Sequence, residues 1–270
     1  MNQDSFLGEI ARAFIGVRGV EAVAWCGSTA MQKGDSLSDY DLYVYWKTPV
    51  LLDARKKIIA NRTSEYQLDN TFWDLEDEWI EPEGQRCNAI YRSCREAEEE
   101  VDRRLVRHVA SLGYTTACCF TLSKGKRLAD PNGWLTGLQG QIPKSYPPAL
   151  AQSILRKNRP VLGGGMQCCY LQQIETSIIR QDPVSLNHRV AAWLSSYFDI
   201  LFAINGQFHP GEKRLLIYAQ ELASLPANAM SDVRQLCALA GKLEPPIALH
   251  LDEMLEHLDK KLTELGYRPR

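Results

Sequence analysis

The fold of the first half of the chain is decided by Trp25-Cys26-Gly27-Ser28 and, ten residues later, Asp39-Tyr40-Asp41-Leu42. The run of Val and Ala over 20–26 predicts a buried strand that ends at the Gly-Ser pair. Residues 40–46 are rich in β-forming side chains and predict a second strand. Because residues two apart on a strand point to one face of the sheet, Asp39 and Asp41 are expected to lie side by side.

These small residues and carboxylates together indicate a phosphate and metal site. Glycine at position 27 allows a close approach of the backbone to a phosphate, and Ser28 Oγ with nearby N–H groups can donate to phosphate oxygens. Two neighbouring carboxylates repel each other unless a cation lies between them. Mg²⁺ fits, because it takes oxygen ligands and bridges to substrate phosphates. We therefore expect Gly27 and Ser28 to contact a nucleotide and Asp39 and Asp41 to hold metal. The alternative is a surface turn with two solvated aspartates.

The same residues resemble the signature of the DNA polymerase β superfamily of nucleotidyltransferases. That signature is a hydrophobic residue, Gly, Gly or Ser, a spacer, and Asp-x-Asp among hydrophobic residues; the matching positions are Cys26, Gly27, Ser28, Asp39, Asp41 and Leu42. The resemblance implies two Mg²⁺ ions roughly 3.5–4 Å apart, which stabilise the attacking and leaving oxygens. It also implies ATP or another nucleoside triphosphate as donor, and transfer of a nucleotidyl group, AMP from ATP, to a hydroxyl. Asp39 and Asp41 are then catalytic residues.

The third acidic residue of the superfamily is missing from its expected place. In relatives it lies on a later strand, binds the catalytic metal and can accept the proton of the attacking hydroxyl. Here residues 85–92 predict that strand, and Asn88 stands at the expected position. Asn88 can offer its amide oxygen to a metal ion, but it cannot act as a base at neutral pH. This departure keeps a second interpretation open: a nucleotide-binding or regulatory protein with weak or no catalysis.

A hairpin over 72–92 offers a replacement carboxylate. Residues 72–80 and 85–92 predict two strands joined by Glu81-Pro82-Glu83-Gly84. With these four residues as the loop, Ile80 pairs with Gln85, and Asp77 lies opposite Asn88 on the same face. Asp77 is thus a candidate catalytic base. A register shift of one residue would exchange Asp77 and Glu78, and a solvated acidic strand edge is the alternative interpretation.

The second half of the chain predicts consecutive helices. The segment 142–148 contains three prolines and marks a boundary. We expect an α+β protein: a mixed-sheet nucleotidyltransferase domain over 1–143, followed by an all-α helical bundle domain over 147–270. Residues 186–205 are apolar nearly all round, which is typical of a central bundle helix. The other predicted elements are helices over 6–14, 51–60, 96–112, 149–156, 167–180, 212–222, 231–241 and 247–265, and a strand over 115–122.

This order of domains resembles the kanamycin and lincosamide nucleotidyltransferases, in which the bundle closes the cleft over the acceptor. The stretches 113–116, 188–205 and 209–214 also resemble a bacterial family of uncharacterised proteins with a nucleotidyltransferase-like first half. That second resemblance implies the fold and no substrate.

Two polar residues of the second half are candidates for lining a cleft. Lys213, in the first turn of the predicted helix 212–222, could contact a nucleotide phosphate; a capped surface helix is the alternative. Asp199 lies within an apolar helix, where an unpaired carboxylate is costly. We expect it to pair with Arg180, His188 or Arg189, or else to contact substrate.

Composition favours a small-molecule acceptor. The net charge is only −2 over 270 residues, so no general basic field would hold a nucleic acid. An acceptor on RNA or on a partner protein is a third hypothesis, with Lys124, Lys126 and Arg127 as local phosphate contacts. No apolar run is long enough to cross a membrane, and residues 1–6 lack a signal-peptide pattern. The eight cysteines have no C-x-x-C spacing and predict free thiols, mostly in the core, of a cytoplasmic protein.

Overall fold

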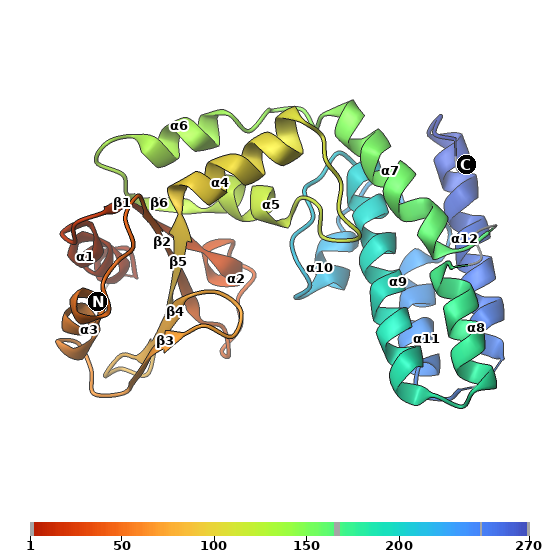
Figure 1. Cartoon of the computed structure of the whole chain (residues 1–270), viewed down its shortest axis with the longest axis horizontal. Helices are drawn as coiled ribbons and strands as arrows, with labels where there is room; N and C mark the ends of the chain where they lie inside the picture. The colour runs from red at the N-terminus through yellow and green to blue at the C-terminus, as the bar shows by residue number, and fades with distance from the viewer. Residues whose placement is uncertain (1–2, 165–167, 244, 269–270) are drawn as a thin grey trace. The chain divides into compact units, whose positions relative to one another are not determined.

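The computed structural model describes residues 3–164, 168–243 and 245–268, which divide into two compact units (Figure 1). Unit 1 takes Met1–Asp102 and Thr121–Ile142, and unit 2 takes Arg103–Phe120 and Pro143–Arg270. Unit 2 therefore includes residues 103–120, which the sequence analysis assigns to the first domain. The predicted α+β class is confirmed, because unit 1 contains a mixed sheet and the elements from 148 onward are helical.

The sheet of unit 1 has the strand order β3-β4-β5-β2-β1-β6. All neighbours are antiparallel except β2 and β5, which pair in parallel. The strands are β1 (Val20–Cys26), β2 (Tyr40–Trp46), β3 (Tyr66–Asn70), β4 (Glu76–Ile80), β5 (Arg86–Ser93) and β6 (Lys126–Ala129). The bounds of β1 and β2 are those predicted, and the sequence analysis missed β3 and β6.

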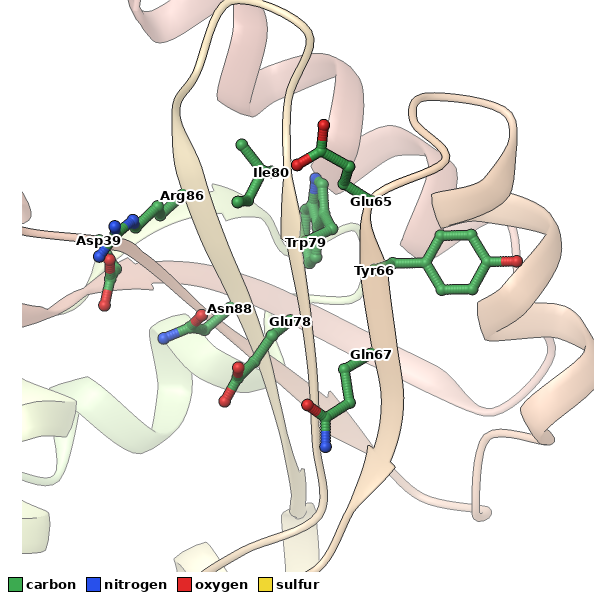
Figure 2. Close-up of a pocket in the computed structure, with 9 residues that line it drawn as sticks. All are labelled: Asp39, Glu65, Tyr66, Gln67, Glu78, Trp79, Ile80, Arg86 and Asn88. Carbon is green, nitrogen blue, oxygen red and sulfur yellow. The ribbon is translucent and has the colours of Figure 1, made fainter.

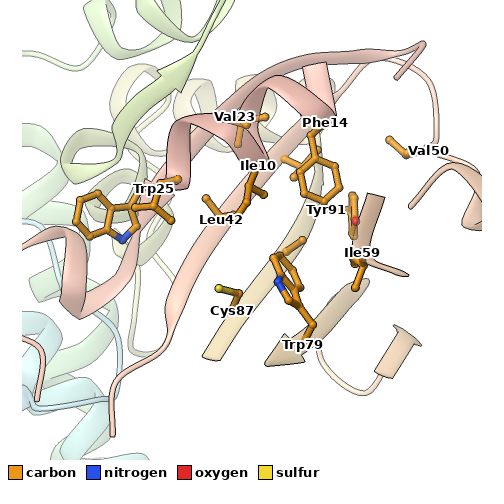
Figure 3. Close-up of a cluster of buried hydrophobic side chains, with 14 of the residues drawn as sticks. Ile10, Phe14, Val23, Trp25, Leu42, Val50, Ile59, Trp79, Cys87 and Tyr91 are labelled. Atoms are coloured by element: carbon orange, nitrogen blue, oxygen red, sulfur yellow. The ribbon is translucent and has the colours of Figure 1, made fainter. Parts of the chain in front are cut away.

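One face of this sheet, the core face, is apolar and covered by helices. The helices α1 (Gln3–Ile15) and α3 (Leu52–Ala60) pack on it, as Figure 3 shows. The cluster includes Ile10, Phe14, Val23, Leu42, Val44, Ile59 and Ala89, all 0% exposed. Full burial of each large apolar side chain contributes roughly 1.5–3 kcal/mol. This alternation of inward apolar residues turns the odd-numbered side chains of β2, including Asp41, to the opposite face.

The opposite face, called here the acidic face, is covered over only part of its length. The helices α4 (Cys94–Val101) and α6 (Trp134–Gly140) contact β5 and β1. At that end the rings of Tyr45 and Trp134 lie 5.2 Å apart between centroids, and Trp134 Nε1 donates to Glu98 at 2.6 Å. The other end of the face, where β1 stops and β2 and β5 start, carries the polar residues described below.

The segment between α4 and α6 differs from its prediction. The predicted helix 96–112 continues after Val101 only as the π-helical turn η1 (Asp102–Val106). The strand predicted over 115–122 is wrong, because those residues lead into the helix α5 (Ala117–Lys124). The backbone N–H of Thr115 donates to Asp199 at 3.0 Å, and the N–H of Phe120 donates to the carbonyl of Thr116 at 2.9 Å. These backbone N–H groups are therefore not available to pair with a neighbouring strand, although the segment is rich in β-forming residues.

Unit 2 is built around α9 (Pro183–Ile204), which packs against α7, α8 and α10. The predicted central helix is confirmed, since Trp193, Ile200 and Leu201 are 0% exposed. The other helices are α7 (Pro148–Leu162), α8 (Tyr170–Ile179), α10 (Leu215–Ala219), α11 (Ala229–Leu239) and α12 (Pro246–Glu264). The predicted start of α8 at residue 167 lies outside the described residues. No helix in the described part of the chain is both long and apolar enough to cross a membrane.

The carboxylate of Asp199 is satisfied by partners that the sequence did not indicate. Its oxygens accept from the N–H and Oγ1 of Thr115, at 3.0 and 2.6 Å, and from Nδ2 of Asn158 at 3.3 Å. The predicted pairing with Arg180, His188 or Arg189 is therefore wrong. Burial, opposed by these hydrogen bonds, raises the pKa of Asp199 to about 6. The residue ties the 111–116 segment to α9.

Candidate functional site

The turn after β1 lies directly against Asp41. Cys26 pairs with Asp41 across the β1–β2 ladder, and Gly27 follows with φ of +73°. A Cβ at Gly27 would lie 2.0 Å from Asp41 Oδ2, so only glycine fits both the space and the backbone conformation. Ser28 comes next in the short helix α2 (Gly27–Ala30), and its carbonyl accepts from the N–H of Lys33 at 2.9 Å. The structure thus brings the predicted Gly-Ser turn and the Asp-x-Asp strand into contact.

A hydroxyl positions Asp39 relative to this turn. Trp25 Nε1 donates to Thr29 Oγ1 at 3.0 Å, and Thr29 Oγ1 donates to the carbonyl oxygen of Asp39 at 3.0 Å. Asp39 Oδ1 is buried and has no hydrogen-bond partner among the described residues. A buried carboxylate oxygen without a partner is costly. The oxygen is therefore suited to a bound cation.

A row of polar side chains crosses the acidic face from β2 to β4. Asp41 on β2 pairs with Asn88 on β5, and Asn88 pairs with Glu78 on β4. Asn88 Nδ2 donates to Asp41 Oδ1 at 3.4 Å, which leaves the amide oxygen of Asn88 as its acceptor group. Directly opposite residues share a sheet face, so Asp41, Asn88 and Glu78 project to the same side.

This pairing corrects the predicted position of Asp77, which lies opposite Ala89 and not opposite Asn88. The hairpin loop has five residues rather than four, since Ile80 pairs with Arg86 and the N–H of Glu81 donates to the carbonyl of Gln85 at 2.8 Å. One extra loop residue shifts the register by one and exchanges the two faces of β4. The structure therefore puts Glu78 on the acidic face in place of Asp77.

Asp77 lies on the core face, fully buried and fully paired. It accepts from Arg55 Nη1 at 2.7 Å, from the hydroxyl of Tyr91 at 2.7 Å and from the N–H of Asp69 at 2.9 Å. Burial, and then the charge of Asp77, raise the pKa of the Tyr91 hydroxyl well above its usual value, so Tyr91 remains a donor. Asp77 joins β3, β4, β5 and α3, and it is separated from Asp39 and Asp41 by the sheet. The prediction of Asp77 as catalytic base is wrong.

A pocket of about 450 Å³ opens at the start of β5 and the end of β4. It is lined by Asp39, Glu65, Tyr66, Gln67, Glu78, Trp79, Ile80, Arg86 and Asn88. Figure 2 shows Asn88 and Glu78 projecting to the same side of the sheet, and Arg86 extending toward Asp39. Three of the lining residues are carboxylates and one, Arg86, is a cation. The sequence analysis missed Thr29 and Arg86, and it named Glu78 only through the alternative of a one-residue register shift, which the structure has.

The thiol beside the row remains neutral. Cys26 is buried next to Asp41, and burial, with the charge of Asp41 as the second cause, raises the pKa of its thiol far above the usual value. Burial is also the first cause that raises the pKa of Tyr43, the next residue along the same face of β2. Metal binding by cysteine needs the thiolate, so oxygen ligands alone would hold a cation here.

The donor set at the row fits Mg²⁺, which prefers carboxylate, amide and water oxygens. Asp39 and Asp41 would supply carboxylates, and Asn88 would supply an amide oxygen. Over residues 3–164, 168–243 and 245–268, no group of three or more His, Cys, Asp or Glu side chains converges as a metal site. A site here would therefore rest on two carboxylates, the amide oxygen, water and the substrate's own phosphate oxygens.

Lys213 lies in unit 2, exposed, in the turn before α10. The predicted helix start at residue 212 is wrong, because α10 begins at Leu215 and Arg214 before it has φ of +59°. The helix N-terminus that was to support Lys213 is therefore absent at that position. Contact between Lys213 and a phosphate stays a prediction from the sequence.

The sequence matches no model of a known protein family and no curated protein. Among solved structures, the chain is similar to a nucleotidyltransferase-like protein from Exiguobacterium sibiricum, with 13% sequence identity and a TM-score of 0.45. The similarity covers 98% of this chain and 79% of the other. A similarity of this size does not assign an activity, so the function has to be argued from the pocket.

Proposed function

We propose that this chain is a Mg²⁺-dependent nucleotidyltransferase that moves the nucleotidyl group of a nucleoside triphosphate, AMP from ATP, to a hydroxyl of a small acceptor. The observation that carries the proposal is the contact between Gly27 and Asp41, where a Cβ would lie 2.0 Å from the carboxylate. Because of this contact, the backbone of Gly27 lies beside the carboxylate of Asp41, where a phosphate and the cation bound to it would meet. The buried oxygen of Asp39, which has no partner among the residues that the structure describes, supports the same site.

Each residue of the site has a separate task in this proposal. The backbone at Gly27 and the hydroxyl of Ser28 bind phosphate oxygens. Asp39, Asp41 and the amide oxygen of Asn88 would hold Mg²⁺, which supplies charge neutralisation at the attacking and leaving oxygens when it is bound. Thr29 keeps the backbone of Asp39 in place.

The pocket supports a small acceptor. Its volume of about 450 Å³ falls within the range of roughly 300–1,000 Å³ that is typical of small-molecule sites. The carboxylates of Asp39, Glu65 and Glu78 outnumber the guanidinium of Arg86. A lining of this charge repels the phosphates of an RNA acceptor and favours a neutral or cationic molecule.

Calorimetry tests the proposal directly. ATP is titrated into wild type and into the Asp39→Ala/Asp41→Ala variant, each with and without Mg²⁺. We expect Mg²⁺ to strengthen binding to wild type at least tenfold, and the variant to lose that gain. Glu9→Ala, an exposed carboxylate on α1, serves as the matched control. An absence of triphosphate binding to wild type would contradict the proposal.

One observation favours a second candidate, a nucleotide-binding protein without transfer. The amide of Asn88 donates to Asp41, where an aspartate would add a negative charge and a base. Incubation with ATP labelled at the α-phosphate separates the two candidates. Label that passes to an acceptor or to water supports the enzyme, and tight binding without any transfer supports the second candidate.

A further inference from the structure

The row on the acidic face contains one carboxylate that the proposed function does not yet use. Glu78 occupies the third position of the row, directly opposite Asn88. It is half-buried and lines the pocket together with Asp39 and Asn88. Figure 2 shows the side chains of Asn88 and Glu78 next to each other on the same side of the sheet.

The partners of Glu78 contrast with those of its neighbour in the chain. Asp77 accepts three hydrogen bonds of 2.7 to 2.9 Å on the core face. The hydrogen bond from Asn70 Nδ2 to Glu78 Oε1 is 3.5 Å long, and the same amide donates to Glu76 at 3.2 Å. Such a weakly held carboxylate on a pocket wall is available to accept a proton from a ligand.

The spacing of the strands assigns Glu78 a role toward the acceptor rather than toward the metal. Neighbouring strands lie about 4.8 Å apart, so the backbones of β2 and β4 are about 10 Å apart across β5. Glu78 therefore stands on the side of Asn88 that faces away from Asp41. The absence of a convergent group of three carboxylates among the described residues agrees with this separation.

We propose that Glu78 accepts the proton of the attacking hydroxyl, a task that Asn88 cannot perform. This rests on the proposed function. The acceptor oxygen forms a bond to the α-phosphorus, the bond from that phosphorus to the oxygen bridging to the β-phosphate breaks, and pyrophosphate leaves with the electron pair. The proton of the hydroxyl moves to the carboxylate of Glu78. A positioned general base of this kind contributes typically 10²–10⁴-fold to a rate.

The test compares Glu78→Gln with Glu76→Gln, its matched control. Glu76 lies on the same strand and the same face, two residues from Glu78, and it does not line the pocket. Two quantities are measured: the affinity for ATP with Mg²⁺ by calorimetry, and the transfer of the labelled adenylyl group of α-labelled ATP to water or to glycerol, with release of pyrophosphate. The pH dependence of that release is recorded for each protein.

We expect Glu78→Gln to lower the rate at least about 100-fold, with the ATP affinity unchanged within a factor of about three and the acidic limb of the pH profile lost. Glu76→Gln should match wild type in rate and affinity. In Glu78→Gln/Asn88→Asp the carboxylate moves from β4 to β5, and part of the rate should return. The unchanged ATP affinity of Glu78→Gln shows that this variant folds.

Wild-type rates in Glu78→Gln would overturn the assignment of Glu78 while leaving the proposed function intact. A parallel loss of ATP affinity and rate in Glu78→Gln would also overturn it, because the residue would then bind ligand. If wild type binds ATP with Mg²⁺ but transfers no adenylyl group to water or glycerol, both this inference and the proposed transfer fail, and the binding site alone remains.

Discussion

The two faces of β4 carry neighbouring carboxylates in opposite situations. On the core face, Asp77 is 0% exposed and paired with Arg55, Tyr91 and the backbone of Asp69. On the acidic face, the side chain of Glu78 accepts a hydrogen bond of 3.5 Å, and Asp39 nearby has a buried oxygen with no partner in the part of the chain that the structure describes. A buried charge is normally paired or bound to a metal. In this unit the carboxylate with strong hydrogen bonds to all its neighbours holds the fold together, and the carboxylates with few hydrogen-bond partners mark the place for a ligand.

The largest effect on stability should come from removing the fully hydrogen-bonded carboxylate of Asp77. Asp77→Ala removes one carboxylate from the guanidinium of Arg55, whose side chain is 3% exposed, and leaves it the half-exposed Asp69 as a counterion. Removing one partner of a buried pair costs about 3–5 kcal/mol of the free energy of unfolding. Urea unfolding followed by circular dichroism measures this loss. The neighbouring change Glu78→Ala should cost less than about 1 kcal/mol, and equal losses in the two variants would remove the contrast between the faces.

Unit 2 contains a similar contrast, between His209 and Asp199. The contributions of these two residues to stability depend on pH in opposite directions. Burial lowers the pKa of His209, whose Nε2 has no partner among the described residues, to about 4. Because the folded pKa lies below the usual 6.5, the stability it contributes is full above pH 6.5 and is lost as the pH falls toward 4. Asp199 has hydrogen-bond partners, and its pKa is raised to about 6. Its contribution to stability is therefore largest at low pH and is lost as the pH rises through 6.

These two contributions, each amounting to about 3 kcal/mol, oppose and nearly cancel each other between pH 4 and 6.5. In His209→Gln the free energy of unfolding should fall as the pH rises, and in Asp199→Asn it should rise. Urea unfolding at several pH values measures both slopes. Parallel slopes in the two variants would contradict the assignment.

The next effect tests the contact at the site itself. Gly27→Ala forces a Cβ toward Asp41 Oδ2 and strains a backbone with φ of +73°. We expect a loss of about 1–3 kcal/mol in unfolding free energy and at least tenfold weaker binding of ATP with Mg²⁺. Gly84→Ala is the matched control, since its φ is +88° but nothing lies within 4 Å of the added Cβ. It should show the strain without any change in ATP binding.

The smallest effect should come from the hydroxyl that holds Asp39. Thr29→Val removes the hydrogen bonds to Trp25 and to the carbonyl of Asp39, each 3.0 Å long. A loss of about 0.5–1.5 kcal/mol in stability is expected for the hydrogen bonds, with ATP affinity reduced about threefold as Asp39 loses its fixed position. Thr29→Ser keeps the hydroxyl and should restore both quantities. If Thr29→Val matched Thr29→Ser in stability and in ATP affinity, the hydroxyl and its two hydrogen bonds would have no role in holding Asp39.

The sequence predicted the strands that carry the site better than the register that completes it. The Val- and Ala-rich run into Gly27 and the spacing to Asp39 and Asp41 are local patterns, so β1 and β2 were predicted with their observed bounds. On β4, both Trp79 and Ile80 are apolar, and alternation alone does not decide which of them is buried. Trp79 is 2% exposed and Ile80 38% exposed, which fixes the face of Asp77 and Glu78.

The segment around Thr115 was beyond sequence reasoning for a different reason. Its β-forming residues predicted a strand, but Thr115 is held by Asp199, which lies 84 residues later in the chain. A partner so distant leaves no local signal, and tertiary contacts override propensity in such cases. The same limit applies to Arg55, whose partner Asp77 was taken for a catalytic residue.

The parallel pairing of β2 and β5 makes the site a reporter of folding. Asp41 and Asn88 meet across a separation of 47 residues. A hairpin such as β4–β5 forms in about 1–10 μs, whereas non-local parallel pairs close slowly. An intermediate that contains the hairpin alone has Glu78 beside Asn88 but lacks Asp41. During refolding, the appearance of nucleotide binding should therefore lag behind strand formation and time the completion of the sheet.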